Sequence, residues 1–175
     1  MERTKFSTLD QLKDQITKEM HKDYFFNGEV FNPLNEGWWF QFDNGTRRMG
    51  QCSIHLKRIS LSRKMCELNM NRWDLIEDIL LHELAHAFTE KIYGKESSGH
   101  TPQFRRIAKS MGSSLLGSMI PKSFGLRVPY RYKYRCPGCG GTWERQKKIE
   151  GSCRACSGSN IYDPKFKLVL VDEAL

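Results

Sequence analysis

The sequence predicts an α+β fold in which a small antiparallel sheet packs against helices, followed by a small cysteine-containing module. Aromatic-rich runs separated by turn residues between residues 27 and 62 favour strands. Four cysteines stand in two close pairs near the C-terminus. Apolar side chains recur at helical spacing in three segments, which are residues 9–20, 73–88 and 104–111.

The length and composition suit one domain with a sizeable core plus a small module. The 175 residues are 39% hydrophobic and 27% charged, as in a soluble globular protein. The chain lacks a long apolar run and its first residues lack the apolar stretch of a secretory signal. We therefore expect no membrane contact and a reducing compartment, which is the cytoplasm of a prokaryotic or virus-infected cell or the nucleus of a eukaryotic one. We place the domain at residues 1–125 and the module at 126–175.

The first helix is expected to run from about residue 8 to about Lys22. Ser7 or Thr8 can cap it, and Asp10 lies in its first turn. Its apolar stripe consists of Leu9, Leu12, Ile16 and Met20.

The next segment is expected to form strands. Trp38 to Phe42 is aromatic-rich and is followed by the turn signal Asp43-Asn44-Gly45. Arg47 to Ile54 would then return as the partner strand of a hairpin. A third strand is expected around Leu56, Ile59 and Leu61.

A long apolar helix follows, starting near Asn71 as its cap and ending before Gly94. It would contain about 22 residues and cross the core of the domain. The next helix begins with Thr101 as cap and Pro102 in its first turn, and it ends at Gly112. Packing on the core is expected to continue through Leu115, Leu116, Met119 and Ile120.

The long helix contains a His-Glu-x-x-His motif at His82, Glu83 and His86. Residues four apart share one face of a helix, so the two imidazoles can bind a single metal ion. The glutamate beside the first ligand is then placed to act as a general base. The simpler interpretation is that two histidines fall four apart by chance. We favour zinc-dependent hydrolysis.

His100 is the candidate for a third ligand. It directly precedes the helix cap at Thr101, next to the flexible Gly99. Three protein ligands leave one position open, as in catalytic zinc sites. A histidine before a helix is often only a surface residue, and Glu90 and Glu96 remain rival ligands. The metzincin pattern is excluded because its glycine and last histidine would fall at Thr89 and Ile92.

The C-terminal cysteines predict a second, structural metal site. Two Cys-x2-Cys pairs separated by thirteen residues match the spacing of a four-thiolate zinc ribbon. A module of this size has too small a hydrophobic core to fold without a structural metal ion. The ligands would be Cys136, Cys139, Cys153 and Cys156, so the chain would bind two Zn²⁺ ions, one catalytic and one structural.

Positive charge suggests nucleic acid as a partner. The net charge is +8, and ten basic against three acidic residues lie between Leu126 and Leu168. Tyr and basic residues alternate from Tyr130 to Arg135, so a strand would place tyrosines on one face and cations on the other. The tyrosines could stack on bases or pack on the first domain, and the charge could be only a solvated surface. The candidate nucleic-acid residues are Tyr130, Arg131, Tyr132, Lys133, Arg135, Arg145, Lys147 and Lys148.

From about Gly37 to Cys156 the chain resembles the SprT-like metalloproteases, the family that includes Spartan. The residues that carry the resemblance are the run Leu80 to Ala87, the pair Gly99-His100 with Phe104, the Gly50-x-Cys52 and Ile59-x-Leu61-Ser62 segments, and the four cysteines.

The resemblance implies a zincin-like metalloprotease core and a zinc peptidase with His82, His86 and His100 as ligands and Glu83 as base. For Spartan-type members it also implies DNA-stimulated cleavage of proteins crosslinked to DNA, so protein substrates and single-stranded or junction DNA are the expected partners. The alternative is a non-enzymatic zinc-containing protein that binds DNA or acts as a scaffold.

Overall fold

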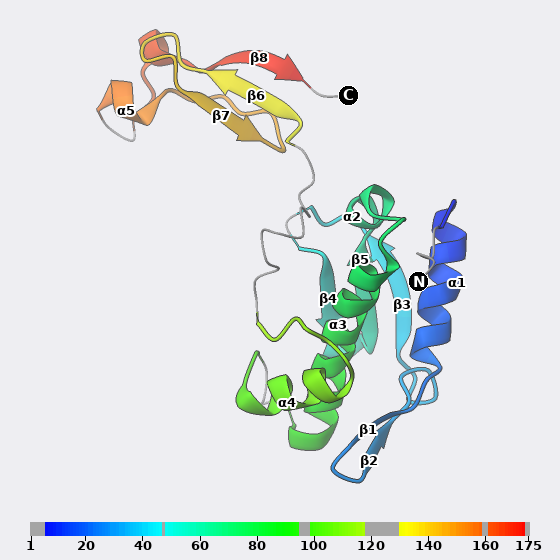
Figure 1. Cartoon of the computed structure of the whole chain (residues 1–175). Helices are drawn as coiled ribbons and strands as arrows, with labels where there is room; N and C mark the ends of the chain where they lie inside the picture. The colour runs from blue at the N-terminus through cyan, green and yellow to red at the C-terminus, as the bar shows by residue number, and fades with distance from the viewer. Residues whose placement is uncertain (1–5, 47, 95–98, 118–129, 159–160, 174–175) are drawn as a thin grey trace. The chain divides into compact units, whose positions relative to one another are not determined.

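The structure is a computed structural model that describes residues 6–46, 48–94, 99–117, 130–158 and 161–173. The chain divides into two compact units, Met1–Val128 and Pro129–Leu175 (Figure 1). The predicted domain boundary between residues 125 and 126 lies outside the described residues. Mixed helices and small sheets confirm the α+β class. Within the described ranges, a helix long and apolar enough to cross a bilayer is absent.

The three predicted helices of the first unit are present. Helix α1 spans Leu9–Met20 and is capped by the Thr8 side chain, which accepts from the Gln11 N–H. Helix α4 spans Pro102–Ser110 behind its Thr101 cap. Helix α3 spans Trp73–Tyr93 and ends at Gly94, as expected. Its N-cap is Arg72, so the expected cap at Asn71 was wrong by one residue.

The main sheet is mixed, which corrects the antiparallel prediction. Strands β3 (Trp39–Asp43), β4 (Gly50–Ser53) and β5 (Arg58–Ser62) lie in the order β3-β5-β4. Strand β5 pairs antiparallel with β4 and parallel with β3. The predicted β3–β4 hairpin is therefore wrong.

A short turn explains this topology. The 3-10 turn η1 (Ile54–Leu56) and the left-handed Lys57 (φ 44°) join β4 directly to β5. The Asp43 carboxylate accepts hydrogen bonds from the Gly45 N–H at 2.7 Å and from the Ser60 hydroxyl at 2.9 Å. These bonds tie the end of β3 to β5, so β5 occupies the centre of the sheet.

Two elements were not predicted individually. A hairpin of β1 (Tyr24–Phe26) and β2 (Glu29–Phe31) turns through Asn27 and Gly28, both at positive φ. Asn-Gly is the strongest two-residue hairpin signal, and it was available in the sequence. A short helix α2 (Arg63–Leu68) follows β5 and is capped by the Ser62 side chain.

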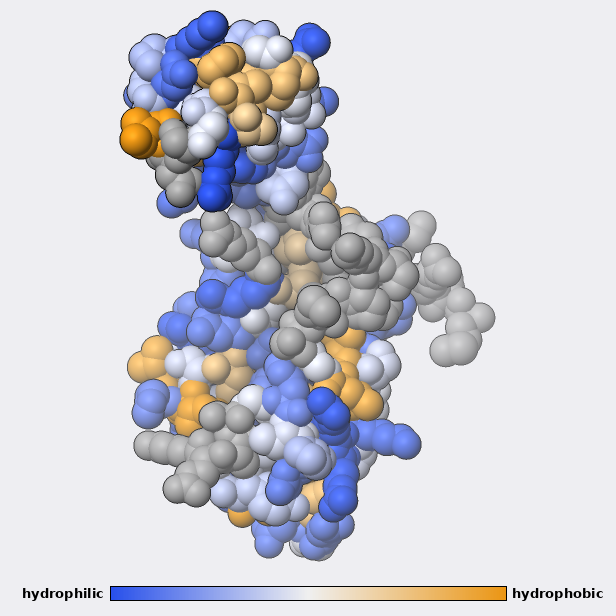
Figure 2. Space-filling model, turned by 90° about the vertical axis from the view of Figure 1, so that its left-hand side faces the viewer, coloured by the Kyte–Doolittle hydropathy of each residue, from blue (hydrophilic) through white to orange (hydrophobic). Residues whose placement is uncertain are grey.

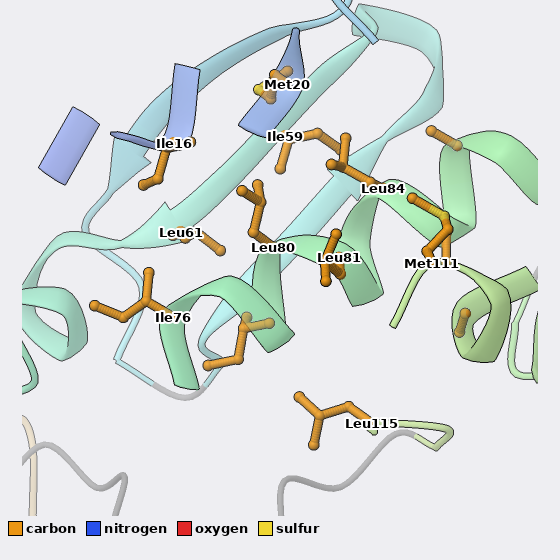
Figure 3. Close-up of a cluster of buried hydrophobic side chains, with 14 of the residues drawn as sticks. Ile16, Met20, Ile59, Leu61, Ile76, Leu80, Leu81, Leu84, Met111 and Leu115 are labelled. Carbon is orange, nitrogen blue, oxygen red and sulfur yellow. The ribbon is translucent and has the colours of Figure 1, made fainter. Parts of the chain in front are cut away.

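One hydrophobic cluster joins the helices and the sheet of the first unit. Ile16 and Met20 from α1 gather with Ile59 and Leu61 from β5 and with α3 side chains such as Leu80 (Figure 3). Met111 and Leu115, which follow α4, belong to the same cluster. Leu116 packs against it, whereas Met119 and Ile120 lie outside the described residues. The sequence of α3 is apolar on most sides, and the helix is accordingly buried over its central turns.

The second unit is a three-stranded antiparallel sheet in the order β7-β6-β8. Its strands are β6 (Tyr132–Arg135), β7 (Thr142–Arg145) and β8 (Val169–Glu173). Two short helices, α5 (Arg154–Ser157) and the 3-10 turn η4 (Pro164–Phe166), complete it. Strand β8 closes the sheet by pairing antiparallel with β6. Hydrophilic side chains cover much of the face of both units seen in Figure 2.

Candidate functional site

Helix α3 carries the three residues of the His-Glu-x-x-His motif in its buried middle. His82 and Glu83 are buried, and His86 is partly buried. The ring centroids of His82 and His86 lie 5.0 Å apart, as expected for positions four apart on one helix face. The helix packs along β4 and β5, so these polar groups stand on a rigid element.

His100 lies with these two imidazoles. Its ring centroid is 5.0 Å from that of His82 and 4.9 Å from that of His86. Each of the three side chains offers a nitrogen within 4.8 Å of the others. The left-handed Gly99 (φ 95°) and the Thr101 cap place His100 at the start of α4. Within the described ranges, Glu90 is not part of this group, and Glu96 lies outside them.

Phe104 forms the apolar floor of the histidine cluster. Its fully buried ring stacks on His86 with centroids 4.2 Å apart. It also meets His82 edge-on at 5.0 Å and His100 at 4.9 Å. The sequence placed Phe104 on the buried stripe of its helix, but its contact with all three imidazoles emerges only from the packing of α4 on α3.

The electrostatic setting keeps the imidazoles neutral. Burial lowers the pKa of His82, with His100 adding to the effect. Burial and the two other histidines lower the pKa of His86 to about 3. Burial and Arg105 lower the pKa of His100. Neutral imidazoles have free lone pairs, which is the state that a metal ion binds.

The orientation of His82 is fixed by a backbone carbonyl. Its Nδ1 lies 2.5 Å from the Leu115 oxygen, which can only accept, so Nδ1 carries the proton. Nε2 is then unprotonated and lies 3.0 Å from Nε2 of His100. Metal-binding histidines commonly donate their second ring N–H to such a partner. The donor set therefore fits zinc in chemistry and in arrangement.

Glu83, the residue after His82 on helix α3, lies against β4. Burial raises the pKa of its carboxyl to about 7, although a hydrogen bond from the Cys52 N–H and the charge of Arg48 oppose the rise. A Cβ added to Gly50 would lie 2.7 Å from both Cγ and Oε1 of Glu83. Only glycine at this position leaves space for the carboxylate. The sequence signal was the Gly50-x-Cys52 segment, but its contact with Glu83 was not foreseen.

The four predicted cysteines of the second unit also lie together. Their sulfur atoms are all within 4.8 Å of one another. The sulfurs of Cys136 and Cys156 are 3.8 Å apart, as are those of Cys139 and Cys153, far beyond a disulfide bond. The Gly138 N–H donates to the Cys136 sulfur at 3.3 Å. Although burial acts in the opposite direction, this N–H and that of Cys139 lower the pKa of the Cys136 thiol to about 7. Four convergent sulfurs form a possible metal site.

If the four sulfurs hold a metal ion, its removal is expected to unfold the second unit. Its buried residues among those described are few, namely Tyr132, Tyr134, Cys136 and Cys153. Such a core is too small to hold three strands together alone. Cys153→Ser or a strong chelator should collapse the amide signals of β6, β7 and β8 in an ¹H–¹⁵N spectrum. Cys66→Ala, which changes a buried thiol of the first unit, should keep these signals and the metal content. A well-dispersed spectrum of metal-free protein would contradict the expectation.

Seven of the eight candidate nucleic-acid residues are exposed, and the eighth, Tyr132, is buried. Tyr132 is only 8% exposed, and both Arg131 and Lys148 lie over its ring. Both cations also approach the Glu173 carboxylate, at 3.9 and 3.2 Å. Tyr130 is exposed, as are all six predicted cations, Arg131, Lys133, Arg135, Arg145, Lys147 and Lys148.

Sequence reasoning missed a concave surface beside the cysteine cluster. A cavity of about 710 Å³ is lined by Trp143, Arg145 and Arg154, together with residues around Cys153. Trp143 lies on β7 opposite Tyr134 of β6. The lining therefore combines an aromatic side chain with two arginines. The available signal was Trp143 close to the basic residues Arg145, Lys147 and Lys148.

Comparison with known proteins places these features in a family. The sequence model of the SprT-like family matches residues 15–126, which include the three histidines and Glu83 but not the four cysteines. "Protein SprT-like" of Oceanobacillus iheyensis is 33% identical over 121 residues, covering 67% of this chain and 77% of that protein. This chain therefore belongs to the SprT-like family.

Proposed function

We propose that this protein is a zinc-dependent endopeptidase. The observation that carries the proposal is a cluster of three neutral imidazoles together with a buried carboxylate, Glu83, which follows His82 directly on helix α3. A purely structural three-histidine site has no use for that carboxylate. His82, His86 and His100 would hold the ion. A zinc ion held there would supply a Lewis acid and lower the pKa of a bound water.

Glu83 would move the protons of the reaction. Its carboxylate takes a proton from the attacking water while the water oxygen forms a bond to the peptide carbonyl carbon. When the carbon–nitrogen bond breaks, Glu83 delivers that proton to the leaving amine. The Cys52 N–H bonded to Glu83 and the Gly50 backbone against it hold the carboxylate in place.

Strand β4 supports a peptide as the substrate. It lies at one edge of its sheet, and Ser62 N–H donates to the Met49 oxygen at 2.7 Å. Because antiparallel residues alternate, the backbone groups of Gly50 and Cys52 point away from β5. The Cys52 N–H already donates to Glu83, so an extended peptide could pair with the other backbone groups of this edge and pass that carboxylate. The packing of the histidine-bearing helix α3 on this edge strand supports the proposal of a zincin-like core.

We further propose that the substrates are proteins associated with or crosslinked to DNA, and that DNA stimulates cleavage. The exposed cations of the second unit and the cavity at Trp143 support this part. The competing function is a zinc-containing protein that binds DNA or acts as a scaffold without catalysis. The same basic surface would serve that function equally well.

A casein cleavage assay tests both functions. Zinc-loaded protein is incubated with casein alone, with single-stranded DNA, and with junction DNA. Cleavage that requires DNA is the expected result, and it should weaken as salt rises because phosphate contacts are salt-dependent. Cleavage indifferent to DNA would remove DNA from the proposal and leave a general peptidase. DNA binding with no cleavage in any condition would favour the scaffold.

A further inference from the structure

The segment that follows α4 is tied to α3 through one carboxylate. Asp78 accepts a hydrogen bond from the Ser113 hydroxyl at 2.7 Å and from the Ser114 N–H at 2.8 Å. The Ser114 hydroxyl donates to the second oxygen of the same carboxylate. Three donors from two consecutive residues therefore converge on one side chain. Hydrogen bonds to a charged carboxylate are stronger than hydrogen bonds between neutral partners.

This anchored segment orients the first histidine of the cluster. The Leu115 N–H donates to the Ser113 hydroxyl oxygen at 3.2 Å, and the Leu115 carbonyl accepts from Nδ1 of His82 at 2.5 Å. Hydrogen bonds thus hold both the N–H and the carbonyl oxygen of Leu115. Ser113, Leu115 and His82 are all buried, so water does not compete readily for these bonds.

The geometry points to Asp78 as a positioning residue for the proposed metal site. Asp78 lies one helical turn before His82 and, through Ser113 and Leu115, fixes the carbonyl that selects the Nδ1–H form of that imidazole. Nε2 of His82 is thereby left unprotonated and aimed at His86 and His100 before any ion binds. This inference rests on one part of the proposed function, namely that the three histidines bind a metal ion.

A merely structural role for Asp78 would predict something different. If Asp78 only secured the end of α4, its loss would lower thermal stability but leave the protonated nitrogen of His82 unchanged. The position of that proton is therefore the decisive measurement. It can be made on metal-free protein, so it does not depend on whether the protein is a peptidase.

The experiment uses long-range ¹H–¹⁵N spectra of metal-free full-length protein, recorded above the imidazole pKa, with His82 assigned from a His82→Gln spectrum. Wild type should show His82 protonated at Nδ1. Asp78→Ala should shift His82 toward protonation at Nε2. Asp78→Asn retains an acceptor oxygen and should stay close to wild type. Ser114→Ala changes an exposed residue and gives a second variant with little risk to folding.

Metal binding gives the second readout. Titration with Co²⁺ separates the sites, because only the four-thiolate site gives sulfur charge-transfer absorption. Asp78→Ala should weaken binding at the histidine site roughly tenfold, as losses of outer-shell partners do. The matched control is Asp74→Ala, an exposed acid one turn earlier on α3, which should bind as wild type does.

Two results would overturn the inference. The first is a wild-type His82 that is protonated at Nε2. The second is a folded Asp78→Ala protein with an unchanged His82 tautomer and unchanged Co²⁺ affinity. Failure of the histidine site to bind Co²⁺ in wild type, with the tautomer shift intact, would instead count against the proposed function and leave the positioning role of Asp78 supported.

Discussion

Glu83→Gln is expected to abolish peptide cleavage while the fold and the metal content stay intact. Glutamine has the same shape, and its oxygen can still accept the hydrogen bond from the Cys52 N–H. It cannot take or deliver a proton. General-base catalysis contributes about 10²–10⁴-fold to rates, so kcat should fall by at least that factor. Burying a neutral amide in place of a carboxylate should not lower the thermal stability.

The measurement compares casein cleavage, zinc content and melting temperature for the variant and wild type. Glu90→Gln is the matched control, because it makes the same change two turns further along α3. It should keep both activity and metal, and this outcome also tests Glu90 as the rival third ligand. Cleavage by Glu83→Gln at the wild-type rate would refute the assignment of the base.

Gly50→Ala is expected to reduce activity by roughly 10²-fold without loss of zinc. The new Cβ would lie 2.7 Å from Cγ of Glu83, so the buried carboxylate has to move. A displacement of about 1 Å at a catalytic group can cost 10²-fold in rate. The three histidines come from α3 and the start of α4, and so they should retain their positions.

The effect should appear mainly in kcat, with zinc content measured in parallel. Gly117→Ala is the control in the same unit, since a Cβ at that position would have no neighbour within 4 Å. Its activity should equal that of wild type. A Gly50→Ala protein with full activity would show that Glu83 does not need its position against β4.

Local sequence signals predicted most helices of the first unit and the local residue pairs within the histidine and cysteine clusters. The Thr8 and Thr101 caps, the end of α3 at Gly94 and the class of the fold follow from short-range chemistry. The order of the main sheet did not follow, because strand partners are chosen by burial and by connections between distant residues. The Asp43 carboxylate reaches Ser60 on β5, a contact that no local pattern contains.

Sequence spacing alone determined that His82 and His86, and the two cysteines within each Cys-x2-Cys pair, could share a metal. Positions four apart on a helix bring His82 and His86 together, and paired cysteines bring their sulfurs together, since both depend only on local backbone geometry. Tertiary structure alone decided how the histidine site is prepared. The Gly50 backbone against Glu83 and the Leu115 carbonyl at His82 are contacts across more than thirty residues. Only the packing of the sheet and of the segment after α4 onto helix α3 creates them.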